Sequence, residues 1–207
     1  PSHTFKTIGC SRTDAMVSAE HFVCELLIDH ELHCSHFLDE LNQNLPADIC
    51  ALKVENKPKN INIIKSVKQK HYSYTFYFST SPSPFHAPRV GLYRQNPSFE
   101  KMHEVACLFK GEHNFKSFCH RPDHKKSYLR SVDHSSLSKI SDHQYQFEVI
   151  AKGFGHHQVR IMAGTMVDVM LKKISIDQVK KALSGEFDFK IGHIAPASGL
   201  TLKKVHF

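Results

Sequence analysis

The sequence contains no apolar run that approaches the about 20 residues a membrane-spanning helix needs. Its first residues, PSHTFKTIGC, lack the apolar core of a signal peptide. We therefore expect a cytoplasmic protein, or a nuclear or mitochondrial one if the source is eukaryotic. Internal repeats and low-complexity tracts are also absent. With 207 residues, 41% of them hydrophobic, the chain can bury a core, which argues against a disordered or fibrous protein.

Paired cysteines are missing as well. The six cysteines lie far apart and form no CxxC motif, which predicts reduced, largely buried thiols and no disulfide framework. The 17 histidines raise the question of a metal site, and the nearest approach to ligand spacing is Cys119, His120 and His124. Isolated histidines and cysteines in a basic protein are mostly solvated or core residues, so we expect no metal and no other cofactor.

Acidic residues are outnumbered by basic ones. The 27 Lys and Arg exceed the 20 Asp and Glu, for a formal net charge of +7. This balance is compatible with a polyanionic partner such as nucleic acid, but many basic domains bind nothing anionic. Charge alone therefore leaves the partner open.

Hydrophobic periodicity predicts a mixed sequence of strands and helices. The clearest strand is HYSYTFYF, which alternates aromatic and small polar residues, and the clearest buried helix follows Gly155. The first expected strand is apolar enough to be buried on both faces. Expected strands are residues 21–29, 49–54, 71–78, 128–132, 144–151 and 199–207; expected helices are 35–46 (capped by Ser35), 97–111, 157–172 and 176–183 (capped by Ser175).

This order of elements predicts an α+β fold with a mainly antiparallel sheet. Three prolines between Ser79 and Gly91 interrupt the pattern and indicate a linker. We expect an N-terminal half (1–80), a Pro-rich connector (81–96) and a C-terminal half (97–207).

Asp14 and Arg160 are the first candidates for chemistry. Asp14, in SRTDA, is either a turn residue whose carboxylate accepts backbone N–H bonds or a catalytic carboxylate kept ionised by nearby arginines. Arg160 lies on an otherwise apolar helix, where a guanidinium is costly unless it is paired. It either pairs with Asp14 or extends to the surface.

Tyr72 and a set of basic residues are candidates for contact with RNA. Tyr72 shares one strand face with Tyr74, Phe76 and Phe78; core packing is the default interpretation, and a stacking platform for a base is the alternative. The basic residues are explained singly by a solvated surface, or together by phosphate contact. They are Arg89, Arg94, Arg121, Lys125, Lys126 and Arg130.

Several motifs together resemble TruA-type tRNA pseudouridine synthases. SRTDA resembles the family's catalytic loop, G/S-R-T-D-A/K-G-V-H/S-A. The other motifs follow in the family's order over nearly the whole chain. They are NLPADI (44–49), KHYSYTFY (70–77), GEHNFKSF (111–118), GFGHHQVRIMAGTMVDV (153–169) and APASGLTLKKVHF (195–207).

The resemblance implies a cofactor-independent enzyme with two similar halves around a central cleft, which isomerises uridine in tRNA, most commonly in the anticodon stem and loop. Asp14 would be the catalytic aspartate and Arg160 its ion-pair partner. Arg12 would help extrude the target base, and Tyr72 would stack on the uracil or help to deprotonate it. The family also implies a possible homodimer.

Two departures from the family pattern affect these expectations. Met16 stands where the family usually has Gly, so we expect a loop without the left-handed backbone that Gly permits. The family's first strand and helix, with a Y-D-G-T-x-F-x-G-x-Q motif, have no counterpart in the sequence. An RNA-binding protein or RNA-folding helper that keeps the fold without turnover is therefore the alternative function. A hydrolase using Asp14 would need a second carboxylate, and no motif supplies one.

Overall fold

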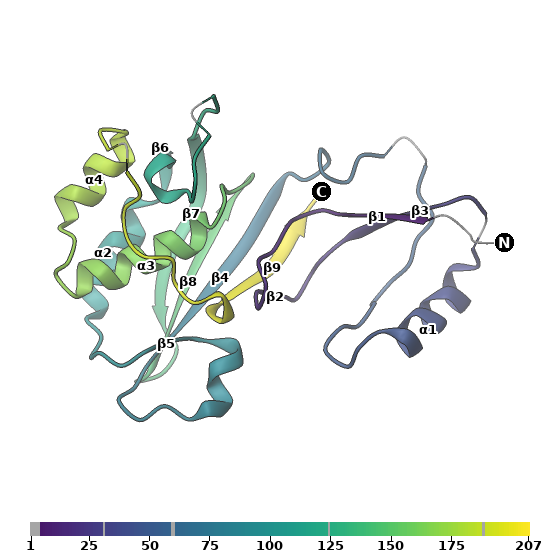
Figure 1. Ribbon diagram of the computed structural model, residues 1–207, viewed down its shortest axis with the longest axis horizontal. Helices are drawn as coiled ribbons and strands as arrows, with labels where there is room; N and C mark the ends of the chain where they lie inside the picture. The colour runs from purple at the N-terminus through teal and green to yellow at the C-terminus, as the bar shows by residue number, and fades with distance from the viewer. Residues whose placement is uncertain (1–4, 31, 59–60, 124, 188) are drawn as a thin grey trace. The chain divides into compact units, whose positions relative to one another are not determined.

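A computed structural model describes residues 5–30, 32–58, 61–123, 125–187 and 189–207 (Figure 1). The chain forms two compact units. Unit 1 comprises residues 1–10 and 23–66, and unit 2 comprises residues 11–22 and 67–207. The expected division into halves at residues 81–96 concerns the internal similarity of the chain and stays a prediction.

Unit 1 contains a two-stranded antiparallel sheet of β1 (Phe5–Gly9) and β3 (Cys24–Ile28), followed by helix α1 (Cys34–Asn44). The expectation that β3 is buried on both faces is wrong, since all its residues are exposed or partly exposed and Leu27 retains 38% exposure. Apolar composition reports what a strand can bury, whereas actual burial depends on the layers packed on it. The expected helix is confirmed, but His33 precedes it in the N-cap position instead of Ser35.

The strand expected at residues 49–54 does not form. The side-chain amide of Asn42 takes the place of a neighbouring strand: its Nδ2 donates to the Ala51 carbonyl at 2.9 Å, and its Oδ1 accepts from the Ala51 N–H at 2.8 Å. These bonds satisfy the N–H and carbonyl groups of Ala51 locally, so they need no hydrogen bonds from a neighbouring strand.

The core of unit 2 is a seven-stranded, mainly antiparallel sheet in the order β2-β9-β4-β8-β7-β6, with β5 beside β4 (Figure 1). The two parallel pairings are short ones, β2 with β9 and β4 with β5. The expected α+β class is confirmed. The strands are β2 (Ser18–Ala19), β4 (Gln69–Phe78), β5 (Gly91–Tyr93), β6 (Gly111–Asn114), β7 (Leu129–Lys139), β8 (Gln144–Ala151) and β9 (Leu200–His206).

Helices α2 (Phe99–Leu108), α3 (Gln158–Met170) and α4 (Ile176–Ser184) gather on one side of this sheet (Figure 1). Every residue of α3 except Arg160 is buried, as its apolar sequence predicts. The cap predicted for α4 is also confirmed, because Ser175 and Gln178 form a capping box. Three 3-10 turns complete the unit: η1 (Pro84–Arg89), η2 (Lys116–Phe118) and η3 (Ala197–Gly199).

All six cysteines are free, as predicted, but the expectation of general burial is wrong. Cys10 and Cys119 are buried, whereas Cys24, Cys50 and Cys107 are exposed. The short apolar segments around the exposed thiols are not all packed against a second layer. Within the described residues, no helix is both long enough and apolar enough to cross a membrane.

The close crossing of α3 and the segment after Ile191 yields a stability prediction. A Cβ on Gly164 would lie 2.0 Å from the His193 carbonyl oxygen, a backbone atom that cannot rotate away. Gly164→Ala should therefore lower the free energy of unfolding by about 1–3 kcal/mol, although Ala is usually the better helix former. Thermal unfolding followed by circular dichroism measures the change.

The matched control is Gly153→Ala. A Cβ at Gly153 would meet no atom within 4 Å, so this variant should stay within about 0.5 kcal/mol of wild type. Equal stability of the two variants would contradict the proposed clash.

Candidate active site

The loop that carries Asp14 is anchored to the edge of the unit 2 sheet. β2 pairs with β9, the Glu20 N–H donates to the Leu202 carbonyl at 2.9 Å, and Lys203 forms an ion pair with Glu20. A tight turn precedes this anchor, with Val17 N–H donating to the Asp14 carbonyl at 3.1 Å. The end of the Asp14 loop is therefore held by residues far from it in sequence.

The Asp14 carboxylate forms an ion pair with Arg160. Arg160 Nη1 donates to Asp14 Oδ2 at 2.6 Å, and the side chains are 14% and 29% exposed, respectively. The alternatives left open by the sequence, a surface-directed Arg160 and an Asp14 bonded only within its turn, do not describe this geometry. Because the pair is partly shielded from water, removing either partner would leave an uncompensated charge, which is costly.

Arg160 is oriented by a second segment. Its Nε donates to the Ala195 carbonyl at 2.8 Å, and the Ala195 N–H donates to the Arg160 carbonyl at 3.1 Å. Arg160 lies in the first turn of α3, so Asp14 also faces the amino end of a helix, where negative charge is favoured. Asp14 is thus held by a guanidinium that is itself fixed by the chain before β9.

His157 is a second partner of Asp14 that the sequence did not single out. Its Nε2 lies 3.2 Å from Asp14 Oδ2, while its Nδ1 is buried and makes no hydrogen bond with the described residues. Burial lowers the pKa of His157 below its ordinary 6.5; Asp14 acts in the opposite direction, and the charges of His156 and Arg160 add to the lowering. The neutral ring with its proton on Nε2 is the form that fits both nitrogens.

Tyr72 lies in the core of β4 with its hydroxyl directed at the Asp14 loop. The residue is only 7% exposed, and its ring meets that of Phe154 edge to face at 5.4 Å. Its hydroxyl is 3.2 Å from Ser11 Oγ, which also accepts a bond from Lys70 Nζ at 3.0 Å. The core interpretation of this aromatic strand is therefore the better one for the ring, while the hydroxyl reaches the loop.

Three residues around the site have a left-handed backbone without being glycine. They are Met16 (φ 67°), Arg121 (φ 50°) and His157 (φ 56°). The expectation that Met16 would avoid this region is wrong: the turn after Asp14 demands positive φ, and Met16 adopts it with its side chain 73% exposed. Such strain costs about 1–2 kcal/mol per residue and gathers at functional sites.

The predicted basic residues all belong to unit 2. Arg12, Arg89, Arg94, Arg121, Lys125 and Lys126 are exposed, and Arg130 is partly buried with its guanidinium 6.0 Å from the Tyr128 ring centroid. Arg121 directly follows His120, whose ring lies 5.2 Å from that of His157. Of the predicted basic residues, Arg121 is therefore the direct chain neighbour of a histidine that lies beside His157.

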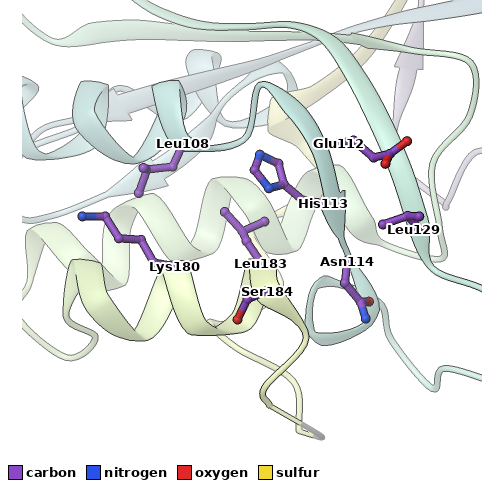
Figure 2. Close-up of a pocket in the computed structure, with 8 residues that line it drawn as sticks. All are labelled: Leu108, Glu112, His113, Asn114, Leu129, Lys180, Leu183 and Ser184. Atoms are coloured by element: carbon purple, nitrogen blue, oxygen red, sulfur yellow. The ribbon is translucent and has the colours of Figure 1, made fainter.

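The metal-ligand spacing noted in the sequence, Cys119, His120 and His124, is described only in part, because His124 lies outside the described residues. Burial raises the pKa of the Cys119 thiol to about 11. A separate pocket of about 450 Å³ lies between the end of α2, β6 and α4 (Figure 2). Figure 2 shows Lys180 and Leu183 of α4 facing Leu108 and His113, and none of the residues around Asp14 lines it.

Comparisons with known proteins identify the family. A family model described as tRNA pseudouridine synthase matches residues 105–207. The tRNA pseudouridine synthase A of Clostridium kluyveri is 31% identical over 200 residues, covering 97% of this chain and 82% of the relative. Those of Moorella thermoacetica and a Hydrogenobaculum species are each 32% identical, covering 97% and 98% of this chain and 81% and 80% of the relatives.

The chain belongs to the tRNA pseudouridine synthase A (TruA) family. The resemblance seen in the short motifs and the expected enzyme class, a pseudouridine synthase, are thereby confirmed.

Sequence reasoning missed His120, His156 and His157 as neighbours of Asp14. A signal was present in the His-His pair directly before the α3 sequence, since adjacent imidazoles at a helix start are unusual. The distance of 36 residues between His120 and His156 hid the third ring, because nothing local relates the two segments.

His157 yields a prediction about pH. Because burial lowers its pKa below 6.5, the unfolded chain binds a proton at this residue more readily than the folded chain between that lowered value and about 6.5. Folding stability should therefore fall as pH decreases through this window. His157→Asn, which tolerates positive φ and cannot titrate, should lose less stability than wild type from about pH 7 to 5.

Urea denaturation across this pH range measures the slope. His134→Asn, an exposed change on β7, controls for replacing any histidine by asparagine. A His157→Asn slope equal to that of wild type would overturn the assignment.

Proposed function

We propose that this chain isomerises uridine to pseudouridine in tRNA, with Asp14 as the catalytic carboxylate. The observation that carries the proposal is the Asp14–Arg160 ion pair of 2.6 Å at the amino end of α3, in a member of the tRNA pseudouridine synthase A family. An aspartate held this closely and still 29% exposed on its side chain is both positioned and reachable.

The reaction requires few side chains from the protein. The C1′–N1 bond of uridine breaks, the uracil turns, C5 joins C1′, and the proton on C5 is lost. A carboxylate can act in this sequence as a nucleophile toward base or sugar, or as a base that removes a proton. In each case Arg160 fixes the direction of the carboxylate and balances its charge, and Ala195 fixes Arg160.

The surrounding residues have proposed roles that fit their positions. Arg12, exposed two residues before Asp14, would enter the RNA stack as the target base leaves it. Tyr72 would present its hydroxyl and ring edge to the uracil, because its ring is buried between β4 and Phe154. Base extrusion costs a few kcal/mol, which contacts from Arg89, Arg94, Arg121, Lys125, Lys126 and Arg130 to phosphates would offset.

The proposed target is a uridine of the anticodon stem and loop, and a homodimer is the proposed assembly, both on the family resemblance. Neither the target uridine nor the assembly state changes the chemistry proposed at Asp14. Assaying full-length tRNA beside an isolated anticodon stem-loop, and measuring the mass of the chain in solution by light scattering, tests each separately.

The catalytic role of Asp14 has a direct test. Asp14→Asn keeps the shape of the side chain but removes its charge and basicity, so pseudouridine formation should fall by about a hundredfold or more. Product is measured by nuclease digestion of tRNA carrying labelled uridine. Asp39→Asn, an exposed change on α1 in unit 1, is the matched control and should retain activity.

If wild type makes no product while wild type and Asp14→Asn both bind tRNA, the catalytic proposal fails. The RNA-binding alternative would then describe the chain. Unchanged activity of Asp14→Asn would instead remove Asp14 from the reaction and leave the enzyme class intact.

The proposed phosphate contacts predict a change in salt dependence. Replacing Lys125 and Lys126 by Ala should reduce the slope of log Kd for tRNA against log salt by about 1.4–1.8, because each phosphate contact releases about 0.7–0.9 counterion. Lys180→Ala with Lys181→Ala, an adjacent exposed pair on α4, removes the same charge and should leave the slope near the wild-type value. Filter binding at several salt concentrations measures it, and equal slopes for the two double variants would argue against this contact surface.

A further inference from the structure

Three imidazole rings gather beside the proposed catalytic carboxylate. His156 and His157 precede α3, and His120 follows η2. The ring centroids of His156 and His157 are 3.9 Å apart, and His120 lies 5.4 Å from His156 and 5.2 Å from His157. The His120 N–H donates to the His156 carbonyl at 2.9 Å, so the two segments are tied by their backbones.

The donor atoms of this cluster converge. Asp14, His156 and His157 each offer one oxygen or nitrogen, and these three atoms lie within 4.8 Å of one another. His157 Nε2 and Asp14 Oδ2 are 3.2 Å apart. Two ligands of a tetrahedral zinc ion with bonds of about 2.0 Å are separated by roughly 3.3 Å. The Asp14–His157 pair therefore already has the spacing of two ligands.

We propose that Asp14, His156 and His157 bind a divalent transition-metal ion such as Zn²⁺, and that the bound ion inhibits the enzyme. The inhibitory part rests on the proposed function, because it requires Asp14 to be the catalytic carboxylate. Two imidazoles and one carboxylate favour Zn²⁺, Co²⁺ or Ni²⁺ over Mg²⁺, which prefers oxygen ligands.

Binding needs little rearrangement. The His156 side chain is exposed and can turn toward the other two ligands, while its Nδ1 lies 3.3 Å from the His120 carbonyl, which leaves Nε2 available. Binding through Nε2 would place the proton of the neutral His157 ring on Nδ1, so this ring releases no proton on balance. Arg160 shares Asp14 and opposes a second cation, so the site should be reversible and weaker than a structural zinc site.

An occupied site would block the proposed reaction in two ways. The ion would engage the carboxylate that the reaction requires, and it would stand where the uracil must approach Asp14. Excess tRNA should therefore protect the enzyme from the metal. The histidines would make the activity of this chain sensitive to free transition metal while the reaction itself uses none.

Binding is tested without RNA. Chelator-treated full chain is titrated with Zn²⁺ by calorimetry and with Co²⁺ by visible absorption, and one ion per chain is expected. His156→Ala should weaken the association at least about tenfold, His134→Ala should bind as wild type does, and Mg²⁺ should give no signal at the same concentration. Circular dichroism checks that the variants are folded. No Zn²⁺ binding by wild type, or equal affinity in folded His156→Ala, would overturn the site.

Inhibition is tested as the ratio of pseudouridine formation with and without Zn²⁺. The ratio should fall for wild type at metal concentrations that leave it unchanged for His156→Ala, and added tRNA should raise it. Equal inhibition of both proteins would overturn the inhibitory role. If neither protein makes pseudouridine, the proposed function fails, while the calorimetric titration still decides the metal site.

Discussion

The architecture of the site depends on one constraint, the need to neutralise a guanidinium on a helix that is otherwise entirely buried. Arg160 is the only residue of α3 that retains exposure, and it meets Asp14 at 2.6 Å and the Ala195 carbonyl at 2.8 Å. Three segments far apart in sequence are thereby joined at one charge. A loop, a helix start and the chain before β9 must each be placed correctly, since an unpaired charge at this depth would be costly.

This arrangement is accompanied by strained backbone conformations. Met16, Arg121 and His157 all hold positive φ near the carboxylate, and His157 buries a ring nitrogen without a hydrogen bond among the described residues. Packed neighbours hold these residues in place, because α3 is almost fully buried and half of the residues of β4 are buried. A helix packed on all sides cannot shift to relieve strain at its end, so the strain stays where Asp14 is positioned.

Most of the regular structure of unit 2 could be predicted from local patterns. Alternation identified β4 and β8, apolar content identified α3, and the serine before α4 formed the predicted capping box. The predictions of strand formation and burial that failed concern partners. Residues 49–54 had strand-like composition, but Asn42 satisfied the Ala51 backbone, and β3 had a core-like sequence yet stayed partly exposed. Local sequence encodes the tendency of a segment to form a strand or a helix, but it does not encode which other elements pack against that segment.

The sequence by itself determined most of the element types and the basic charge, because both follow from local composition and periodicity, and it left two alternatives for Arg160, pairing with Asp14 or extending to the surface. Only the tertiary structure decided what else surrounds Asp14. His120 and His157 are 37 positions apart in the numbering, and they meet because the chain after η2 bonds to the chain before α3. Contacts over such separations follow from the packing of sheet and helices, which no local periodicity records.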